Sequence, residues 1–315
     1  MAPCYSLEEA RTCGVLKGAS CAFGVFDGLH RGHQFIIEQA CTSARETGAS
    51  SLVITFDRDP DELFAPKVLH KLQSNKQRLA SLTQSGVDAV CIIPFDEDFA
   101  SQSPEDFLAA TFSSCEPAHL HVGCDFRFGA QARGDIATLK QWGATCDCAV
   151  HAHDLYVADG APITSTRIRH LLTEGNIREA NALLGHAYSL EGCVIEGRKQ
   201  GRDFGFPTAN IQASSQMHAL ADGVYAAYAQ VGNVVRRAAV SLGESPLFAH
   251  KGAASCEVHI LDFDGNLYGH ELQVRFYERI RGMIAFEDVD QLKTTVRDNI
   301  AWVRDNMPQE EKDAS

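Results

Sequence analysis

The chain has 315 residues, of which 45% are hydrophobic and 22% charged, so it can form one large or two medium-sized globular domains. Its formal net charge of −13 argues against nonspecific nucleic-acid binding, which needs a basic surface. It has no apolar run of about 18 residues, and its first residues, MAPCYSLEEARTCG, do not form a secretory signal. We therefore expect a cytoplasmic protein without nucleic-acid or membrane partners.

The first predicted strand, residues 20–26, ends in an unusual turn. After the letters SCAFGVF, the stretch DGLHRGH supplies two glycines, an aspartate and two histidines. The next segment, 34–48, has the apolar spacing of an amphipathic helix that stops at Gly48. His30 and His33 then lie at a helix start, where imidazoles can donate hydrogen bonds to a phosphoryl group. Two ordinary surface histidines are the alternative.

Strands and helices alternate through the rest of the first half. Residues 51–56, 89–95 and 119–123 are predicted strands, and 75–86 and 104–114 are predicted helices. Such alternation predicts a parallel α/β sheet of Rossmann-like type, with ligands at the carboxyl ends of its strands. The turn with the two histidines lies at such an end.

The segment 146–153, CDCAVHAH, has two interpretations. Cys146, Cys148, His151 and His153 are all possible zinc ligands. A strand would instead point the cysteines to one face and the histidines to the other, and we favour this interpretation. The 11 cysteines include no Cys-x-x-Cys pair, which is typical of reduced thiols.

A helix is predicted over residues 163–185, with Arg167 and Arg169 in its first turns. The amino end of a helix is itself positive, so two arginines there indicate a bound anion. A pair of solvent-facing arginines is the alternative. The helix starts with possible capping residues, Thr164, Ser165 and Thr166.

After about residue 186 the pattern changes to strands without intervening helices. The alternating segments predict a small antiparallel barrel or sandwich, closed by a helix over 289–306. The change of period predicts two domains, 1–186 and 187–315. The predicted strands are 188–197, 223–232, 234–243, 256–265 and 270–280.

The second domain carries a glycine-rich stretch, GRDFGFPTAN, whose Gly201 and Gly205 suit a loop over phosphates. Thr208 and Asn210 follow as neutral oxygen ligands for Mg²⁺. A simple turn at Phe206-Pro207 is the alternative.

Glu257 alternates out of step with its apolar neighbours Val258 and Ile260, as a barrel residue facing a pocket does. The letters DFDG that follow resemble part of a calcium loop. A hairpin turn at Asp264-Gly265 is the simpler interpretation.

Several stretches together resemble one family. GVFDGLHRGH is similar to the nucleotidylyltransferase signature, and HVGCDFRFGAQARGD and ITSTRIRHLL resemble two further blocks of the same enzymes. GRKQGRDFGFPTANI resembles the riboflavin kinase signature. In this order the motifs are those of the bacterial bifunctional riboflavin kinase/FMN adenylyltransferases, also called FAD synthetases, and the resemblance runs from about residue 15 to about 305.

The resemblance implies two activities that use ATP. The first domain would transfer AMP from ATP to FMN, giving FAD and pyrophosphate, and the barrel would phosphorylate riboflavin with ATP and Mg²⁺. It also implies site residues. Those matching the ATP site of the first domain are Gly24, Phe26, Asp27, His30, His33, Ser165, Thr166 and Arg169, and Asp125 matches a position lining it. In the kinase, Gly201, Gly205, Pro207, Thr208 and Asn210 match the ATP site, and Glu257 matches the general base.

The chain departs from the family pattern mainly around the flavin. Val25 stands for the usual Asn, and Asp59 in FDRDP for the usual His. In the kinase the changed positions are Glu244, Ser245, Met283 and Ala285. Two other functions therefore stay open: an adenylyltransferase with an impaired or relic second domain, and a flavin-binding regulator without turnover. The sequence does not predict the oligomeric state.

Overall fold

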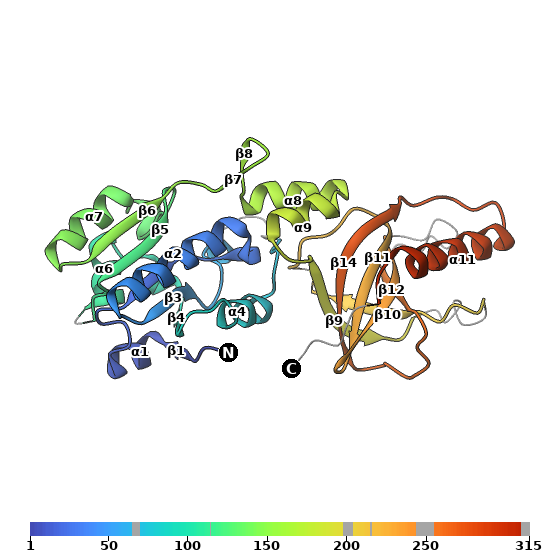
Figure 1. Cartoon of the computed structure of the whole chain (residues 1–315), viewed down its shortest axis with the longest axis horizontal. Coiled ribbons are helices and arrows are strands. Elements are labelled where there is room, and N and C mark those ends of the chain that lie inside the picture. Colours follow the sequence, from blue (N-terminus) through green and yellow to red (C-terminus); the bar gives the residue numbers. More distant parts are fainter. Residues whose placement is uncertain (65–69, 114, 198–203, 215, 244–254, 310–315) are drawn as a thin grey trace. The chain divides into compact units, whose positions relative to one another are not determined.

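The computed structural model describes residues 1–64, 70–113, 115–197, 204–214, 216–243 and 255–309. Contacts divide the chain into two compact units, Met1–Ser165 and Thr166–Ser315, which are described one at a time (Figure 1). Gly201, Glu244 and Ser245 lie outside the described residues.

The first unit is built on a six-stranded parallel sheet in the order β1-β4-β3-β2-β5-β6, which confirms the predicted α/β fold. Its strands are β1 (Cys4–Ser6), β2 (Ser20–Phe23), β3 (Ser51–Phe56), β4 (Ala89–Ile93), β5 (His119–Gly123) and β6 (Ala149–His153). The edge strand β1 was not predicted, because three residues carry too short a pattern.

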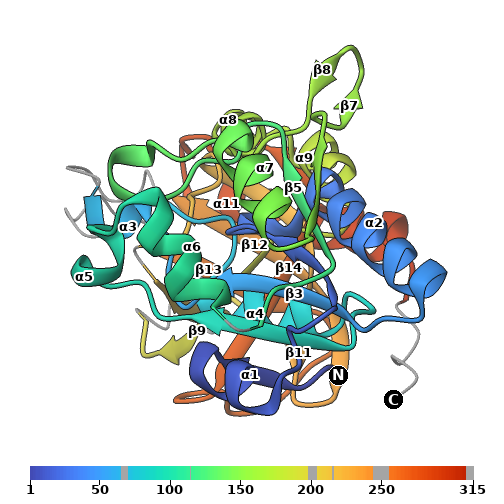
Figure 2. The ribbon, with the colours of Figure 1, turned by 90° about the vertical axis from the view of Figure 1, so that its left-hand side faces the viewer.

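Helices cover both faces of this sheet (Figures 1 and 2). Alternate strand residues point to opposite sides, so Phe23 and Ile54 enter one core cluster and Ala22 and Val53 the other. The first cluster includes residues of α1 (Leu7–Cys13), α6 (Pro104–Phe112) and α7 (Ile136–Thr145), and the second those of α2 (Arg31–Thr47) and α4 (Asn75–Thr83). Short elements are α3 (Asp61–Phe64), α5 (Glu97–Ala100), η1 (Asp27–Leu29), η2 (Ala130–Ala132) and the hairpin β7 (Val157–Ala158) with β8 (Ala161–Pro162).

The strand order reverses beside β2. From β2 the chain proceeds to β3 and β4 on one side, and it returns to place β5 on the other. In open parallel sheets, ligands bind at the carboxyl ends of the two strands that flank such a reversal. A ligand-binding site is therefore expected at the residues that follow β2 and β5.

The second unit contains a closed antiparallel barrel in the order β10-β13-β12-β11-β14-β9, as predicted. Helix α11 packs on its outer face, where Ala226, Tyr228 and Ala239 meet Ile300 and Val303. The elements are α8 (Ser165–Glu174), α9 (Ile177–Leu184), β9 (Ser189–Ile195), β10 (Ala209–Ala213), β11 (Gly223–Val231), β12 (Val234–Gly243), β13 (Ser255–Ile260), β14 (Glu271–Arg281) and α11 (Val289–Asn306).

Three sequence predictions need correction. The helix predicted over 163–185 is broken into two at Gly175, whose positive φ of 81° ends α8. Strand β10 was missed, because its residues were assigned to the phosphate loop. The hairpin turn at Asp264-Gly265 is wrong, because β13 and β14 are not neighbours in the barrel and a loop connects them.

Helices α8 and α9 are bound to the barrel by hydrogen bonds as well as by packing. The Asn181 amide donates to the Phe276 carbonyl (2.7 Å) and accepts from the Tyr188 N–H (2.8 Å). The Ala221 N–H donates to the Leu172 carbonyl (3.0 Å). These contacts place both helices in the second unit, which begins at Thr166. The domain boundary predicted at residue 186 lies just before the first barrel strand, and the division of the chain into functional domains there stays a prediction.

No helix within the described ranges combines the length and the apolar character needed to span a membrane. The cytoplasmic location remains an expectation.

These contacts predict that a fragment 166–309 is more stable than a fragment 187–309. The longer fragment keeps the buried side chains of α8 and α9, and each fully buried aliphatic side chain contributes about 1.5–3 kcal/mol. We expect a difference of at least about 3 kcal/mol in the free energy of unfolding, measured by urea titration of both fragments. Equal unfolding midpoints would show that the helices do not stabilise the barrel.

Candidate functional site

The turn after β2 has a conformation that few residues tolerate. Phe26 and Leu29 have positive φ angles of 60° and 37°, and Gly28 has 77°. The Phe26 ring is buried and lies over Gly24, where a Cβ atom would come within 3.1 Å of it. Gly24 therefore lets the chain approach this ring, and the turn presents its backbone at the carboxyl end of β2.

The two predicted histidines lie together at the start of α2. The His30 Nδ1 accepts a hydrogen bond from the His33 backbone N–H (3.3 Å) and so caps the helix. The rings stack with centroids 3.6 Å apart. Burial, with His30 adding to it, lowers the pKa of His33 well below its usual value. An imidazole with such a lowered pKa is neutral at pH 7, and in this form it can donate a hydrogen bond to a phosphate but offers it no charge.

Asp27, predicted to bind ATP, connects three parts of the first unit. Its carboxylate accepts hydrogen bonds from the backbone N–H groups of Leu72 (3.1 Å) and Gln73 (3.2 Å). Its backbone carbonyl accepts one from the Ser165 hydroxyl (3.1 Å). The structure therefore brings Asp27 and Ser165 together and gives the Asp27 carboxylate a role in fixing the loop. Thr166 and Arg169 follow Ser165 in the first turns of α8.

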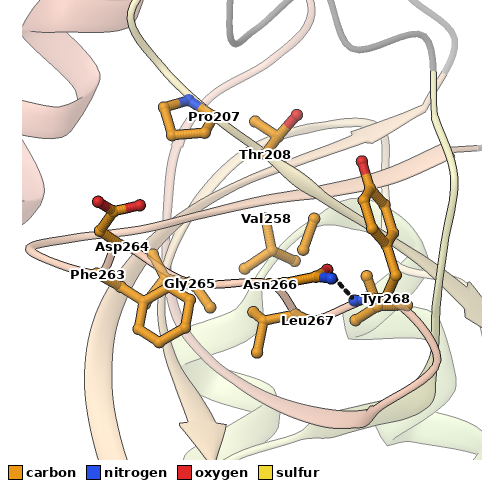
Figure 3. A pocket seen from close by; sticks show the side chains of 12 residues that line it. Pro207, Thr208, Val258, Phe263, Asp264, Gly265, Asn266, Leu267 and Tyr268 are labelled. Carbon is orange, nitrogen blue, oxygen red and sulfur yellow. Dashed lines mark hydrogen bonds between the residues drawn. The ribbon is translucent and has the colours of Figure 1, made fainter.

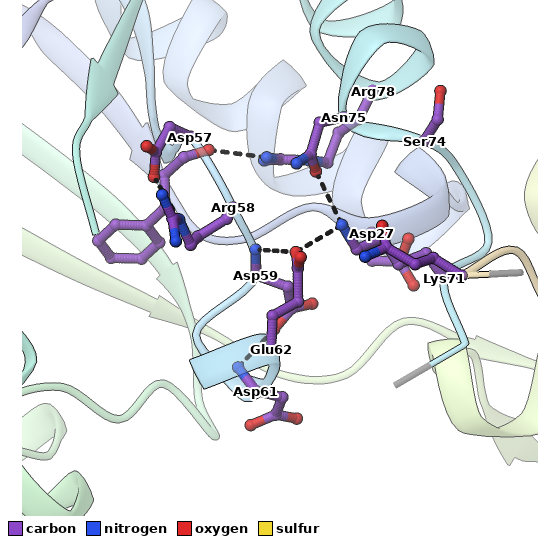
Figure 4. A network of polar contacts seen from close by, with 12 residues as sticks. Asp27, Asp57, Arg58, Asp59, Asp61, Glu62, Lys71, Ser74, Asn75 and Arg78 are labelled. Atoms are coloured by element: carbon purple, nitrogen blue, oxygen red, sulfur yellow. Dashed lines mark hydrogen bonds and ion pairs between the residues drawn. The ribbon is translucent and has the colours of Figure 1, made fainter. Parts of the chain in front are cut away.

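A buried arginine, which sequence reasoning missed, joins the ends of β2 and β3 (Figure 4). Arg78 of α4 is 2% exposed, and its guanidinium donates to the carbonyls of Val25 (2.8 Å) and Phe56 (2.7 Å) and to the Thr55 hydroxyl (2.7 Å). Arginine suits this position because its planar fork satisfies several acceptors at once. The sequence could not reveal this role, because a single arginine in a predicted helix looks the same whether it is exposed or bonded to buried carbonyls.

Asp59, which stands where the family has histidine, lies in the same network (Figure 4). Its carboxylate accepts from the Asp61 N–H (3.0 Å), and its own N–H donates to Glu62 (2.8 Å). Glu62 pairs with the buried Lys71 (2.5 Å). Burial, together with the nearby carboxylates of Asp61 and Asp27, raises the pKa of Asp59 to about 6.

Asp125 lies at the second strand end that flanks the reversal. It is exposed and lies two residues after Gly123, the last residue of β5, and its Oδ1 lies 2.8 Å from where a Cβ atom of Gly123 would be. The carboxylate thus lies over the end of β5. Phe126 anchors the turn through ring contact with Phe23 (5.2 Å between centroids).

In the barrel, strand pairing brings the predicted kinase residues together. Asn210 of β10 is paired with Glu257 of β13, and Glu257 with Ser241 of β12. Residues paired across antiparallel strands share a face. Ala239, two residues from Ser241, packs against α11, so this row lies on the outer face that carries α11. Glu257 therefore faces outward from the barrel.

Sequence reasoning missed Arg281 and Asn299 at this face. Arg281 is paired with Val224, which is paired with Ser241, so it belongs to the same row. Its Nε donates to the side-chain Oδ1 of Asn299 in α11 (3.4 Å). The alternation within β14 was visible in the sequence, but the strand order that aligns Arg281 with Glu257 was not.

The segment before Thr208 lies beside α11 and β13. The cations of Lys293 and Arg297 lie over the rings of Phe204 (5.2 Å) and Phe206 (5.8 Å). The Pro207 carbonyl lies 2.9 Å from the His259 Nδ1. Gly205 has a positive φ of 86°, so the loop after it begins with a conformation that favours glycine.

A cavity of about 690 Å³ adjoins Thr208 (Figure 3). Apolar side chains that point into the barrel, among them Val194 and Val258, form its floor, and the loop with Phe263 and Tyr268 forms its wall. An apolar cavity with two aromatic rings and a few polar groups at its edge suits a planar heteroaromatic base.

The predicted metal ligands fit Mg²⁺ chemically. Thr208 and Asn210 offer neutral oxygens, and the Asn210 side chain occupies the space that a Cβ atom at Gly197 would need. Such a site relies on phosphates and water for its other ligands. Within the described part of the chain, no group of three or more His, Cys, Asp or Glu side chains is placed to hold a metal ion. Cys146 and Cys148 precede β6 and do not share it with His151 and His153.

Comparison with known proteins identifies a family for each half of the chain. A family model described as FAD synthetase matches residues 14–167, and one described as riboflavin kinase matches residues 184–307. The bifunctional riboflavin kinase/FMN adenylyltransferase of Listeria monocytogenes is 34% identical over 86% of this chain and 87% of its own length. That of Pseudomonas fluorescens is 32% identical over 91% and 93%.

The chain belongs to this family. It is an enzyme of FAD biosynthesis, with riboflavin kinase and FMN adenylyltransferase activities. A crystal structure described as a macrolide-efflux protein from Streptococcus pneumoniae is 30% identical, with a TM-score of 0.82 over 92% of this chain and 95% of that one. That likeness supports the fold.

The raised pKa of Asp59 predicts a stability change in Asp59→Asn. Because the folded state holds a proton on Asp59 that the unfolded chain releases near pH 4, the free energy of unfolding falls as the pH rises from about 4 to about 6. Asparagine keeps the acceptor for Asp61 and carries no charge. We expect the substitution to raise the free energy of unfolding by about 1–2 kcal/mol at pH 7.5 and by much less at pH 4.

Urea unfolding in a Trp302→Phe background measures this change, because Trp142 then reports on the first unit alone. Asp98→Asn, which removes an exposed charge elsewhere in the first unit and is not among the groups that shift the pKa of Asp59, is the control. An equal effect of Asp59→Asn at both pH values would contradict the role of its titration.

Proposed function

We propose that residues 1–186 form the FMN adenylyltransferase and residues 187–315 the riboflavin kinase. The observation that carries the proposal is that the parallel sheet and the barrel each carry a separate set of groups suited to one of the two reactions. The first has two stacked histidines at a helix start beside a strand reversal. The second has a carboxylate and an amide paired on one face of a barrel.

In adenylyl transfer, a phosphate oxygen of FMN attacks the α-phosphorus of ATP, and the bond to the pyrophosphate oxygen breaks. No group of the protein needs to become covalently attached. His30, His33 and the N–H groups at the start of α2 donate hydrogen bonds to the oxygens on which charge develops. Gly24 and Phe26 shape the turn that holds the nucleotide, and Asp27 fixes it. Further ligands are predicted to be Ser165, Thr166 and Arg169, with Asp125 lining the site.

In the kinase, Glu257 removes the proton from the 5′-hydroxyl of riboflavin while that oxygen attacks the γ-phosphorus of ATP. Thr208 and Asn210 would hold Mg²⁺, which when bound neutralises charge on the phosphates. The cavity beside Thr208 takes the base of ATP, and its phosphates extend toward Asn210. Arg281 lies in the same row as Glu257, where its cation stabilises charge on the transferred phosphoryl group.

The altered residues bear on the alternative of an impaired kinase. Met283 and Ala285 follow Arg281 directly and replace an acid and a lysine of the family pattern. The groups named for the reaction with ATP are retained. We therefore propose that the kinase is active, with its riboflavin affinity changed more than its turnover. Incubation with riboflavin, ATP and Mg²⁺, followed by separation of FMN and FAD, tests this proposal. If FAD forms only when FMN is supplied, the kinase is impaired. If the protein binds flavin but forms neither product, it is a regulator.

Two substitutions should separate the activities in opposite directions. Glu257→Gln keeps size and hydrogen bonding but cannot accept a proton, so we expect riboflavin phosphorylation to fall by about 10²–10⁴-fold. His33→Ala should lower FAD formation from supplied FMN by about 10²-fold. Each variant should keep the other activity within about threefold, so that each serves as the control for the other.

Steady-state rates of FMN and FAD formation, measured in one preparation of each folded variant, decide the assignment. Loss of both activities in either variant would contradict the division between the units. An undiminished kinase rate in Glu257→Gln would remove this residue from the mechanism.

A further inference from the structure

Four histidines form a ladder across two neighbouring strands of the first unit. His119 and His121 lie on β5, and His151 and His153 on β6. The parallel pairing places His121 opposite His151, and Leu120, between the first two, points into the core on the other face. The four imidazoles, which we call the histidine ladder, therefore share one face of the sheet.

The rings contact one another in a regular pattern. The His119 Nδ1 lies 3.1 Å from the His151 Nε2, and the His121 Nδ1 lies 2.9 Å from the His153 Nε2. The His121 ring also stacks on that of His151, with centroids 4.5 Å apart and planes inclined by 13°. Each nitrogen pair is a hydrogen bond that needs one N–H and one lone pair, so each works with neutral imidazoles.

This geometry does not suit a metal ion. The nitrogens meet in two separate pairs, whereas ligands of one ion converge on one point. In the part of the chain that the structure describes, no three His, Cys, Asp or Glu side chains are placed to hold a metal ion, these histidines included.

Burial makes the ladder sensitive to protons. His121 is 2% exposed, and its Nε2 is buried without a hydrogen-bond partner. The neighbouring strand β2 presents Ser20, which is paired with His119 and whose buried hydroxyl also has no partner. The β2 residue paired with His121 itself is Ala22, which offers no side-chain acceptor. An added proton on the His121 Nε2 would therefore be buried without a hydrogen-bond partner in this arrangement and would meet three other imidazoles.

The other groups that face the ladder give little compensation. From α2, the apolar ring of Phe35 contacts His153 (5.6 Å between centroids), and Glu38 of that helix pairs with Arg45 (2.9 Å). Lys140 of α7 disfavours protonation of His151, and Asp154 favours that of His153. Burial, with the neighbouring histidines adding to it, lowers the pKa of His121 to about 3, and burial also lowers those of His151 and His153.

We propose that the histidine ladder is an acid-sensitive latch that holds the edge strand β6 against β5. Strand β6 is an edge strand and has a neighbour in the sheet on one side only. If the histidine contacts are lost, only its backbone hydrogen bonds with β5 and its packing against α7 still hold it. The His153 carbonyl accepts from the Cys124 N–H (2.8 Å), next to Asp125. Release of β6 therefore disturbs the turn that carries Asp125, and through it adenylyl transfer; this last step rests on the proposed function.

The direction of the pH effect follows from linkage. Histidines in the unfolded chain take up protons near pH 6.5, whereas His121, His151 and His153 of the folded ladder do so only at lower pH. The open or unfolded form therefore binds more protons in this range. The latch is fully present above about pH 6.5 and weakens as the pH falls below it.

Hydrogen–deuterium exchange of the full-length enzyme tests the latch without reference to activity. Exchange of peptides covering 117–125 and 147–156 is followed at pH 7 and pH 5 and corrected for the intrinsic rate. We expect at least about tenfold faster corrected exchange at pH 5 in these peptides, and little change in those of β3 and β4. The double variant His121→Phe/His153→Phe keeps stacked rings but has no titrating nitrogens at these positions, so it should lose most of the acceleration at pH 5. The control is His270→Gln, which changes an exposed histidine of the second unit and should leave the acceleration of the β5 and β6 peptides unchanged.

Acid-independent exchange of β5 and β6 in the unsubstituted enzyme would overturn the proposal, and so would equal acceleration in the double variant. Should the double variant fail to fold, NMR titration of the histidine ring signals in the unsubstituted enzyme decides. Ladder imidazoles that remain neutral at pH 6 support the latch, and ordinary titration near pH 6.5 refutes it. The ratio of FAD formation to riboflavin phosphorylation at pH 5 then tests only the link to adenylyl transfer.

Discussion

The first unit depends on one buried guanidinium. Arg78 donates to the carbonyls that end β2 and β3, and so it holds a turn in which Phe26 and Leu29 have positive φ angles. Without it, the Phe56 carbonyl would lose this donor inside the protein, at a cost of about 1–3 kcal/mol, and the Val25 carbonyl would keep only the longer hydrogen bond from the Thr55 hydroxyl (3.3 Å). Arg78 of α4 therefore positions the backbone of the turn, and with it the capping His30 and the start of α2.

The two units handle phosphate chemistry in different ways. At the end of the parallel sheet, our proposal assigns backbone N–H groups and two stacked histidines to the reacting phosphate, and an FMN phosphate, which is already a nucleophile, needs no proton acceptor. Phosphorylation of riboflavin requires that a hydroxyl be activated, and the carboxylate on the outer face of the barrel is the group that we propose for this step. Strand pairing aligns Glu257 with Asn210, just as the strand reversal brings together the ends of β2 and β5.

The sequence predicted most of the architecture, because apolar periodicity and glycine positions determine strands such as 51–56 and the helix that ends at Gly48. It predicted the histidine pair, because a strand, a turn and a helix start are local. It could not predict Arg78, Arg281 or the histidine ladder, since each depends on which strands and helices become neighbours. The break at Gly175 was also missed, because one glycine within a helical pattern is often tolerated.

The most direct test of this account is the ratio of the two activities in Arg78→Met. Methionine fills similar space but cannot donate to the Val25 and Phe56 carbonyls. The account predicts that FAD formation from supplied FMN falls by at least about 10²-fold, because a displacement of catalytic groups by about 1 Å has effects of this size. Riboflavin phosphorylation by the same folded preparation should stay within about twofold of the unsubstituted enzyme. Unchanged FAD formation would contradict the claim that this buried arginine positions the site.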